Sequence, residues 1–363
     1  MIGWRKTVAQ RPPERLDLLQ PNPHGTGSYR LKPNLDLKAR VGAREVRIRS
    51  NSHGMPWREV EVEPADGRRR IAFLGDSFTF GCWADGWEQA FPAVFEANVS
   101  RRLWEVMSFG VGGYGLADEE LLLREEVIRF GVDYVVIAIF NGNDLRDTWL
   151  GIDKERLVEG TAELDQSVLR ARVPEKELRR DTTTSRPCAL GPVRRLFERS
   201  AAFQLAAPLI GLENQCLEFA ANGKFTMYSY WSQVPYPPVA LDARDATLET
   251  LARIDAYLLE RGVRLAVATI PTREQVHALR DSGHGFDIAL PQAWIRVFAR
   301  ERGIPYLDLL PALREHVLKT NERIYVAGDT HLNNRGHELV GRRMAEWFRC
   351  CVKNQPRPEA TRH

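Results

Sequence analysis

Short, almost continuous apolar runs alternate with amphipathic stretches along most of this chain. Runs of that kind are typical of strands buried on both faces of a parallel sheet. The predicted strands cover residues 71–74, 104–109, 134–140, 264–270 and 304–309. Helical periodicity predicts helices over residues 87–99, 119–130, 248–258 and 337–350. Strands that alternate with helices indicate an α/β fold, with a five-stranded parallel sheet covered by helices on both faces.

Two parts of the chain depart from this rhythm. Over residues 1–66, short alternating stretches such as 29–31 and 45–49 are separated by turn residues, which predicts an N-terminal β extension of short strands. We expect the main domain to span 67–353, with an insertion or lid at about 148–242 and a disordered tail over 354–363. Long insertions in compact domains commonly act as lids or binding walls.

The insertion is expected to be partly helical, with a charged helix over 154–180 and a small apolar helix over 201–212. Its aromatic residues form either the insertion's own core, which we favour, or a wall against an acyl chain or sugar ring. They are Phe225, Tyr228, Tyr230, Trp231 and Tyr236.

Composition and charge narrow the class of protein. A chain of 363 residues with 44% hydrophobic and 27% charged residues is typical of soluble globular proteins. The net charge of +3 is too small to indicate a nucleic-acid partner, and no apolar stretch is long enough to span a membrane. Since no secretory leader is visible and the five cysteines lack metal-ligand spacing, we expect a reduced cytoplasmic protein without a metal or other cofactor.

Ser77 is the first candidate for chemistry. It follows the predicted strand 71–74 in Gly75-Asp76-Ser77, and a helical segment comes after it. Open α/β sheets bind their ligands at the carboxyl ends of the strands, where Ser77 is expected to lie. Taken alone, the motif is better explained as a helix cap, because Asp and Ser are ordinary turn and N-cap residues.

Gly113 and Asn143 follow the next two strands, so they are expected at the same edge of the sheet. Acyl transfer places negative charge on a carbonyl oxygen, and fixed donors aimed at that oxygen lower the barrier. The backbone N–H groups of Ser77 and Gly113 and the side-chain amide of Asn143 are the predicted donors of this oxyanion hole. The alternatives are a plain turn glycine and a loop-capping amide, which are less convincing together than singly.

His331 is the predicted general base, because a histidine can take the proton of a serine hydroxyl at neutral pH. Asp329 lies two residues before it, and a nearby carboxylate would fix the imidazole tautomer. The alternative is that Asp329 caps a turn and His331 is a surface histidine. His337 is expected to pack or to be exposed rather than to act in catalysis, and a metal site on these residues lacks further ligands.

Together these segments resemble the four motif blocks of SGNH/GDSL hydrolases, in order. The blocks are Gly-Asp-Ser-Phe-Thr-Phe-Gly at 75–81, the glycine loop at 110–115, Asn-Asp at 143–144 and Asp-Thr-His at 329–331. Asn-Ser-x-Gly at 51–54 and Ile-Pro-Thr-x-Glu-Gln-Val at 270–276 also match the bacterial branch of that family. The resemblance covers about 45–150 and 245–350.

This resemblance implies a three-layer α/β/α flavodoxin-like sandwich and the roles already assigned to the five site residues. Two positions depart from the family pattern. The acid usually stands three residues before the histidine, where this chain has Gly328, and the second block commonly has Asn in place of Ser108. Two partners are therefore possible for the His331 imidazole: the carboxylate of Asp329, or a backbone carbonyl that accepts its hydrogen bond instead.

The predicted activity is that of a serine esterase that cleaves an acetyl or other short acyl ester of a small metabolite or carbohydrate. An acyltransferase with the same triad, or a catalytically silent binding protein on the same scaffold, remains an alternative. Trp83, just beyond the serine block, is predicted to line the substrate site, and Cys82 beside it to be a small packing residue. The sequence does not indicate an oligomeric state.

Overall fold

The computed structural model describes most of the chain outside the middle segment. The described ranges are 18–24, 28–41, 44–64, 67–150, 220–221, 224–225, 230–236, 238–278, 282–283, 286–327 and 329–353. The helices predicted over 154–180 and 201–212 and the tail predicted over 354–363 lie outside the described residues.

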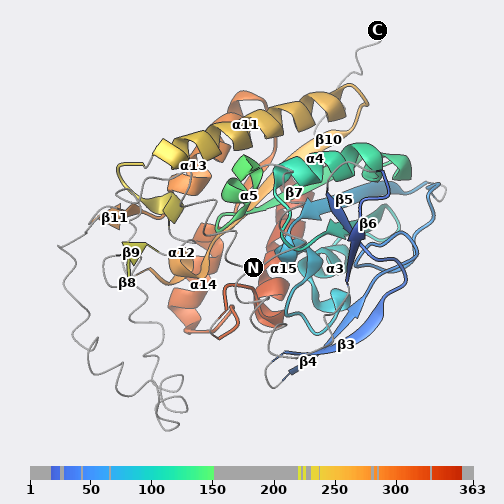
Figure 1. Ribbon diagram of the computed structural model, residues 1–363, viewed down its shortest axis with the longest axis horizontal. Helices are drawn as coiled ribbons and strands as arrows, with labels where there is room; N and C mark the ends of the chain where they lie inside the picture. The colour runs from blue at the N-terminus through green and yellow to red at the C-terminus, as the bar shows by residue number, and fades with distance from the viewer. Residues whose placement is uncertain are drawn as a thin grey trace.

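A five-stranded parallel sheet forms the centre of the molecule, which confirms the predicted fold class (Figure 1). Its spatial order is β13–β10–β7–β5–β6. β5, which comes first of these five strands along the chain, therefore lies inside the sheet. In chain order this is 2-1-3-4-5, the order of flavodoxin-like folds. The bounds are β5 Arg69–Gly75, β6 Trp104–Gly110, β7 Tyr134–Phe140, β10 Arg264–Ile270 and β13 Tyr306–Asp308.

Helices cover both faces of this sheet (Figure 1). The chain turns back after β6, so helices connecting later strands lie on the opposite face from the first one. On one face α3 (Phe91–Ala97) packs against α15 (Asn334–Trp347), and on the other α11 (Pro238–Leu259) contacts α4 (Leu116–Glu125) and α13 (Leu290–Glu301). The other described α-helices are α2 Ser77–Phe80, α5 Asp144–Leu150, α12 Arg273–His277 and α14 Leu310–Thr320.

Several predicted helices have different bounds in the structure. The helix predicted over 87–99 is divided into the 3-10 turn η1 (Trp87–Gln89) and α3, because Pro92 occupies the first turn of α3, where its missing N–H costs nothing. The helix predicted over 119–130 ends at Glu125 and is followed by the 3-10 turn η2 (Val127–Phe130). Helices α13 and α14 were not predicted.

The N-terminal segment forms two antiparallel pairs of strands. They are β1 (Leu19–Pro21) with β2 (Tyr29–Leu31), and β3 (Asp36–Val41) with β4 (Arg44–Arg49). Leu18, Leu31, Val46 and Ile48 form a small apolar cluster of their own. Tyr29 instead packs into the main core, so the first hairpin is joined to the sheet domain. Later in the chain, two short antiparallel pairs are made of two-residue strands. They are β8 (Ala220–Ala221) with β9 (Lys224–Phe225), and β11 (Ser282–Gly283) with β12 (Phe286–Asp287).

The C-terminal end of the described chain differs from the expectation of a reduced protein. After α15 the helix widens into one π turn, η4 (Phe348–Val352), and within it a disulfide joins the adjacent residues Cys350 and Cys351. The expectation of reduced cysteines is therefore wrong for this pair. It rests on the odd number of cysteines and on the absence of metal-ligand spacing, and neither bears on two thiols that are adjacent in the chain. Among the described helices, none combines the length and the hydropathy that crossing a membrane requires.

Candidate active site

Ser77 is the first residue of α2, directly beyond the carboxyl end of β5. The Asp76 carboxylate caps this helix, because its Oδ1 accepts a hydrogen bond from the backbone N–H of Phe78 at 2.8 Å. Neighbouring β6 approaches α2 so closely that a Cβ at Gly110 would lie 2.1 Å from the backbone nitrogen of Phe80. Glycine at the end of β6 therefore lets the turn that carries Ser77 close against the sheet.

The structure brings His331 to Ser77 across 254 residues of sequence. The Nε2 atom of the imidazole lies 2.8 Å from Ser77 Oγ, while the alternative acceptor, Asp76 Oδ2, lies farther from that oxygen at 3.2 Å. The imidazole is only 4% exposed, which rules out the surface-histidine interpretation. It lies in the turn that leads into α15, at the same edge of the sheet as Ser77.

Asp329 contacts the other side of the same ring. Its Oδ1 lies 2.6 Å from His331 Nδ1 and also accepts the backbone N–H of His331 at 2.9 Å. Burial opposes ionisation of this carboxyl, but the hydrogen bonds from His331 outweigh burial and hold the pKa of Asp329 below its usual value. An ionised Asp329 can only accept, so Nδ1 carries the proton and Nε2 is left as the acceptor for the Ser77 hydroxyl.

Arg273 holds the turn that contains Asp329. Its Nη1 donates to the backbone carbonyl of Asp329 at 3.2 Å, from the first residue of α12. The preceding residues are anchored as well, because the buried hydroxyl of Tyr325 donates to the carbonyl of Pro271 at 2.9 Å. The segment 270–276, which the sequence singled out without a role, thus packs against the stretch between α14 and α15.

The glycine loop passes close to Ser77. A Cβ added to Gly112 would be 3.8 Å from the Cβ of Ser77, which is ordinary van der Waals contact. The next residue, Gly113, has a φ of +84°, a conformation that side-chain-bearing residues rarely adopt. Glycine at position 113 therefore gives the loop a sharp turn immediately beside Ser77.

Asn143 lies in the turn between β7 and α5, and its side-chain amide is held by two carboxyl groups of α5. Its Nδ2 donates to Asp147 Oδ2 at 2.8 Å and, at 3.3 Å, to Asp144 Oδ1. Asp147 is in turn paired with the buried guanidinium of Arg146, at 2.7 Å. The turn is also fixed from another side, because the indole N–H of Trp231 donates to the carbonyl of Gly142 at 3.1 Å.

Trp231 and Tyr236 show where part of the predicted aromatic stretch packs. Trp231 is 3% exposed and belongs to the main core, so the favoured interpretation of a separate insertion core is wrong for this residue. Tyr236 packs against Trp294 of α13 with ring centroids 5.0 Å apart and ring planes inclined by 58°. The side chains of Phe225, Tyr228 and Tyr230 lie outside the described residues.

Buried carboxyl groups surround the turns that carry Ser77 and Asn143. Burial raises the pKa of Asp76, and it raises the pKa of Asp144 well above the ordinary aspartate value, with the charge of Asp76 adding to the effect at Asp144. In both carboxyl groups burial opposes the charged form.

The remaining candidates occupy the surroundings of this site. Trp83 has a left-handed backbone with a φ of +69° and lies in the loop after α2, where neighbouring Asp85 hydrogen-bonds Asn334 at the start of α15. Burial raises the pKa of the Cys82 thiol, which fits a packing residue. His337 is fully buried, and its Nδ1 accepts the backbone N–H of Phe91 at 3.3 Å. The part of the chain that the structure describes holds no cluster of potential metal ligands.

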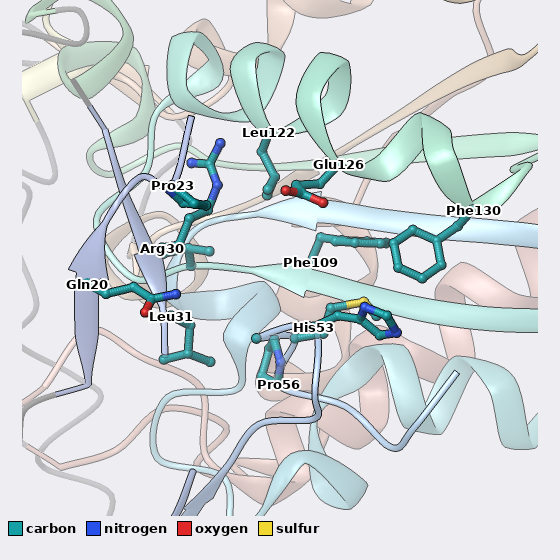
Figure 2. A pocket seen from close by; sticks show the side chains of 13 residues that line it. Gln20, Pro23, Arg30, Leu31, His53, Pro56, Phe109, Leu122, Glu126 and Phe130 are labelled. Atoms are coloured by element: carbon teal, nitrogen blue, oxygen red, sulfur yellow. The ribbon is translucent and has the colours of Figure 1, made fainter. Parts of the chain in front are cut away.

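A cavity of about 70 Å³ lies between the first hairpin, β6 and α4, and Val111 of the glycine loop lines it as well (Figure 2). Figure 2 shows Gln20 and Arg30 reaching it from the first hairpin, Phe109 from β6, and Leu122 and Glu126 from the helix above. Neither Ser77 nor His331 lines this cavity. It is therefore distinct from the space in front of the nucleophile.

Comparisons with known proteins agree with this arrangement at the level of the family. Solved structures that are similar include the acetyl xylan esterase AlAXEase (14% identity, TM-score 0.42, 77% of this chain and 99% of that one). Others are a catalytic mutant of the acetylxylan esterase Axe2 from Geobacillus stearothermophilus (15%, 0.42, 77% and 94%) and a member of the lipolytic G-D-S-L family from Veillonella parvula (13%, 0.39, 78% and 99%).

At such low TM-scores none of these structures bears on the activity of this chain. Among curated proteins, none matches the chain in sequence. The model of the GDSL-like lipase/acylhydrolase family, however, matches residues 73–339, which contain Ser77, the glycine loop, Asn143 and His331. The chain belongs to the GDSL-like lipase/acylhydrolase family of enzymes.

Proposed function

We propose that this enzyme is a serine esterase that hydrolyses an acetyl or other short acyl ester of a small metabolite or carbohydrate. The observation that carries the proposal is the 2.8 Å contact between Ser77 Oγ and His331 Nε2. A serine hydroxyl becomes nucleophilic when a neighbouring base takes its proton, and this contact is within the range that such proton transfer requires.

In the proposed reaction, His331 takes the Ser77 proton while the Ser77 oxygen attacks the ester carbonyl carbon. The carbonyl π electrons move onto the carbonyl oxygen, which gives a tetrahedral intermediate. When this intermediate collapses, the bond to the alcohol oxygen breaks, and His331 returns its proton to that oxygen. Water, deprotonated by His331, hydrolyses the acyl-enzyme in the same way. Asp329 would stabilise the imidazolium at each step, and its lowered pKa supports that role because the carboxylate stays ionised.

The negative charge of the intermediate would be met by three donors: the N–H groups of Ser77 and Gly113 and the amide of Asn143. The nearness of Gly112 to Ser77 supports the second donor, and the fixed position of the Asn143 amide supports the third. In the structure both amide hydrogens are directed at carboxyl groups, that of Asp147 and, at a longer 3.3 Å, that of Asp144. The hydrogen on the longer contact is the one proposed to turn to the substrate. Trp83 is proposed to line the substrate site from the loop after α2.

The test is a series of chromogenic acyl esters of increasing chain length, assayed with the wild type and with Ser77→Ala. We expect turnover to be fastest on the shortest esters and to fall about a million-fold in the variant, as for other serine triads. Wild-type activity of Ser77→Ala would contradict the proposal. A fluorophosphonate probe should label the wild type and not the variant, which separates an enzyme of this mechanism from a silent binding protein.

An acyltransferase would use the same residues, with an alcohol or amine in place of water. Product analysis with and without an added acceptor distinguishes the two activities. If acyl transfer to the acceptor exceeds hydrolysis, the hydrolase assignment is wrong while the assignment of Ser77 stands.

A further inference from the structure

Tyr29, which precedes the region matched by the family model, reaches the glycine loop of the site. Its hydroxyl donates to the backbone carbonyl of Gly112 at 2.7 Å. The carbonyl of Gly112 and the N–H of Gly113 belong to one peptide group, which is planar and places these two atoms on opposite sides. A donor that fixes the carbonyl of Gly112 therefore also fixes the direction of the Gly113 N–H.

We propose that Tyr29 is a positioning residue of the oxyanion hole, which makes the N-terminal hairpin part of the catalytic apparatus. This inference rests on the proposed function, in which Gly113 donates to the oxyanion. Gly113 has the left-handed φ of +84° and glycine has the widest conformational freedom, so the hydrogen bond from Tyr29 restricts the orientation of this peptide. The hydrogen bond also polarises the peptide, which strengthens its N–H as a donor.

The hairpin that carries Tyr29 is itself fixed to the same loop. The ring of Tyr29 packs edge-to-face on Tyr114 with centroids 5.4 Å apart, and the Tyr114 hydroxyl donates to the backbone carbonyl of Tyr29. Arg30 donates to the Tyr114 oxygen at 2.6 Å and pairs with Glu125 of α4 at 2.6 Å. Burial raises the pKa of Tyr114 to about 12, so its hydroxyl keeps the proton that this contact uses.

These contacts hold Tyr29, whose ring is buried in the main core, in a precise location. The cavity of Figure 2 lies beside the hairpin and is lined by Arg30, Leu31 and Val111. Beside this cavity the hairpin is held to the glycine loop by directed hydrogen bonds and one ring contact. Loss of the Tyr29 hydroxyl should therefore release the Gly112–Gly113 peptide without unfolding the hairpin.

The test is Tyr29→Phe, which removes the hydroxyl and keeps the ring. Tyr134→Phe is the matched control, because the Tyr134 hydroxyl also donates to a backbone carbonyl, that of Lys353, at 3.2 Å and at the opposite end of the sheet. On a chromogenic acetyl ester we expect kcat to fall about 10- to 100-fold in Tyr29→Phe with KM nearly unchanged, because an oxyanion-hole donor acts in the transition state. Tyr134→Phe should keep the kcat of the wild type.

A second readout is the affinity for a short alkyl boronic acid, whose tetrahedral serine adduct places an oxygen in the oxyanion hole. We expect this affinity to fall in Tyr29→Phe by a factor similar to that for kcat, and to stay constant in Tyr134→Phe. The inference is wrong if Tyr29→Phe keeps kcat within twofold of the wild type, or if only KM changes. Full activity of Ser77→Ala would instead refute the proposed function itself, so the two failures are distinguishable.

Discussion

The imidazole of His331 stacks on the ring of Phe78, with ring centroids 5.0 Å apart and planes inclined by 29°. Phe78 directly follows Ser77, and its other neighbour is Phe140 at the end of β7, with centroids 4.0 Å apart. The proposed base is therefore supported by an aromatic pair that belongs to the core of the sheet. This support fixes the ring plane, and an aromatic face also stabilises an imidazolium.

Replacement of Phe78 by leucine should lower kcat by about tenfold, because a cation on an aromatic face is stabilised by about 1 kcal/mol or more in a desolvated site. The loss of stacked area should also lower the melting temperature by several degrees. Steady-state kinetics and thermal unfolding check both effects. Phe95→Leu, which removes an edge-to-face contact with Phe73 elsewhere in the core, is the control for stability alone. Equal kinetics of the two variants would show that stacking on His331 is irrelevant to turnover.

Replacement of Asp329 by asparagine should reduce kcat about 10⁴-fold, the effect of removing the acid from a serine triad. The amide would offer a donor to His331 Nδ1 or leave the wrong tautomer, so Nε2 would no longer accept the Ser77 proton. Asp287→Asn is the matched control, because Asp287 Oδ1 also accepts a backbone N–H two residues ahead, that of Ala289 at 2.8 Å. A loss below tenfold in Asp329→Asn would mean that the histidine does not depend on this carboxylate.

Replacement of Asn143 by alanine should lower kcat about 10²- to 10³-fold with little change in KM, because one oxyanion donor is removed. The buried pair of Asp147 and Arg146 stays intact, so we expect the protein to remain folded. Asn98→Ala removes a similar amide, which donates to the carbonyl of Val94 in α3, and should leave kcat unchanged. If Asn143→Ala raised KM alone, the amide would bind substrate in the ground state instead.

His337 should make stability decrease as the pH falls from 6.5 to 4. Burial lowers its pKa from 6.5 to about 4, so in that window the unfolded chain binds a proton that the folded chain does not. The free energy of unfolding should therefore fall by about 1.4 kcal/mol per pH unit from this residue alone. The contribution is absent above pH 6.5, where both states are neutral.

Urea unfolding of the wild type and of His337→Gln at several pH values measures this slope. Glutamine retains an acceptor for the N–H of Phe91 but does not titrate, so its slope should be smaller by about one proton. His277, whose pKa burial also lowers to about 4, remains in both proteins and supplies a common background. Identical slopes would show that His337 is protonated equally in the folded and unfolded states.

The five strands could be predicted because a strand buried on both faces needs an uninterrupted apolar run, and residues 134–140 and 264–270 have one. Bounds were less predictable. The strand predicted over 304–309 is only Tyr306–Asp308, and α13 and α14 were missed, since helix limits depend on packing partners as well as on periodicity. The vicinal disulfide of Cys350 and Cys351 had no signal in composition.

The sequence by itself determined the parallel sheet and the edge at which Ser77, Gly113 and Asn143 lie, because both follow from which residues come directly after buried strands. Only the tertiary structure decided that His331 meets Ser77 at 2.8 Å and that Tyr29 reaches the glycine loop. Such contacts join residues far apart in the chain. They depend on how helices, strands and loops pack against one another in the folded chain. The hydrophobic periodicity within one segment does not encode that packing.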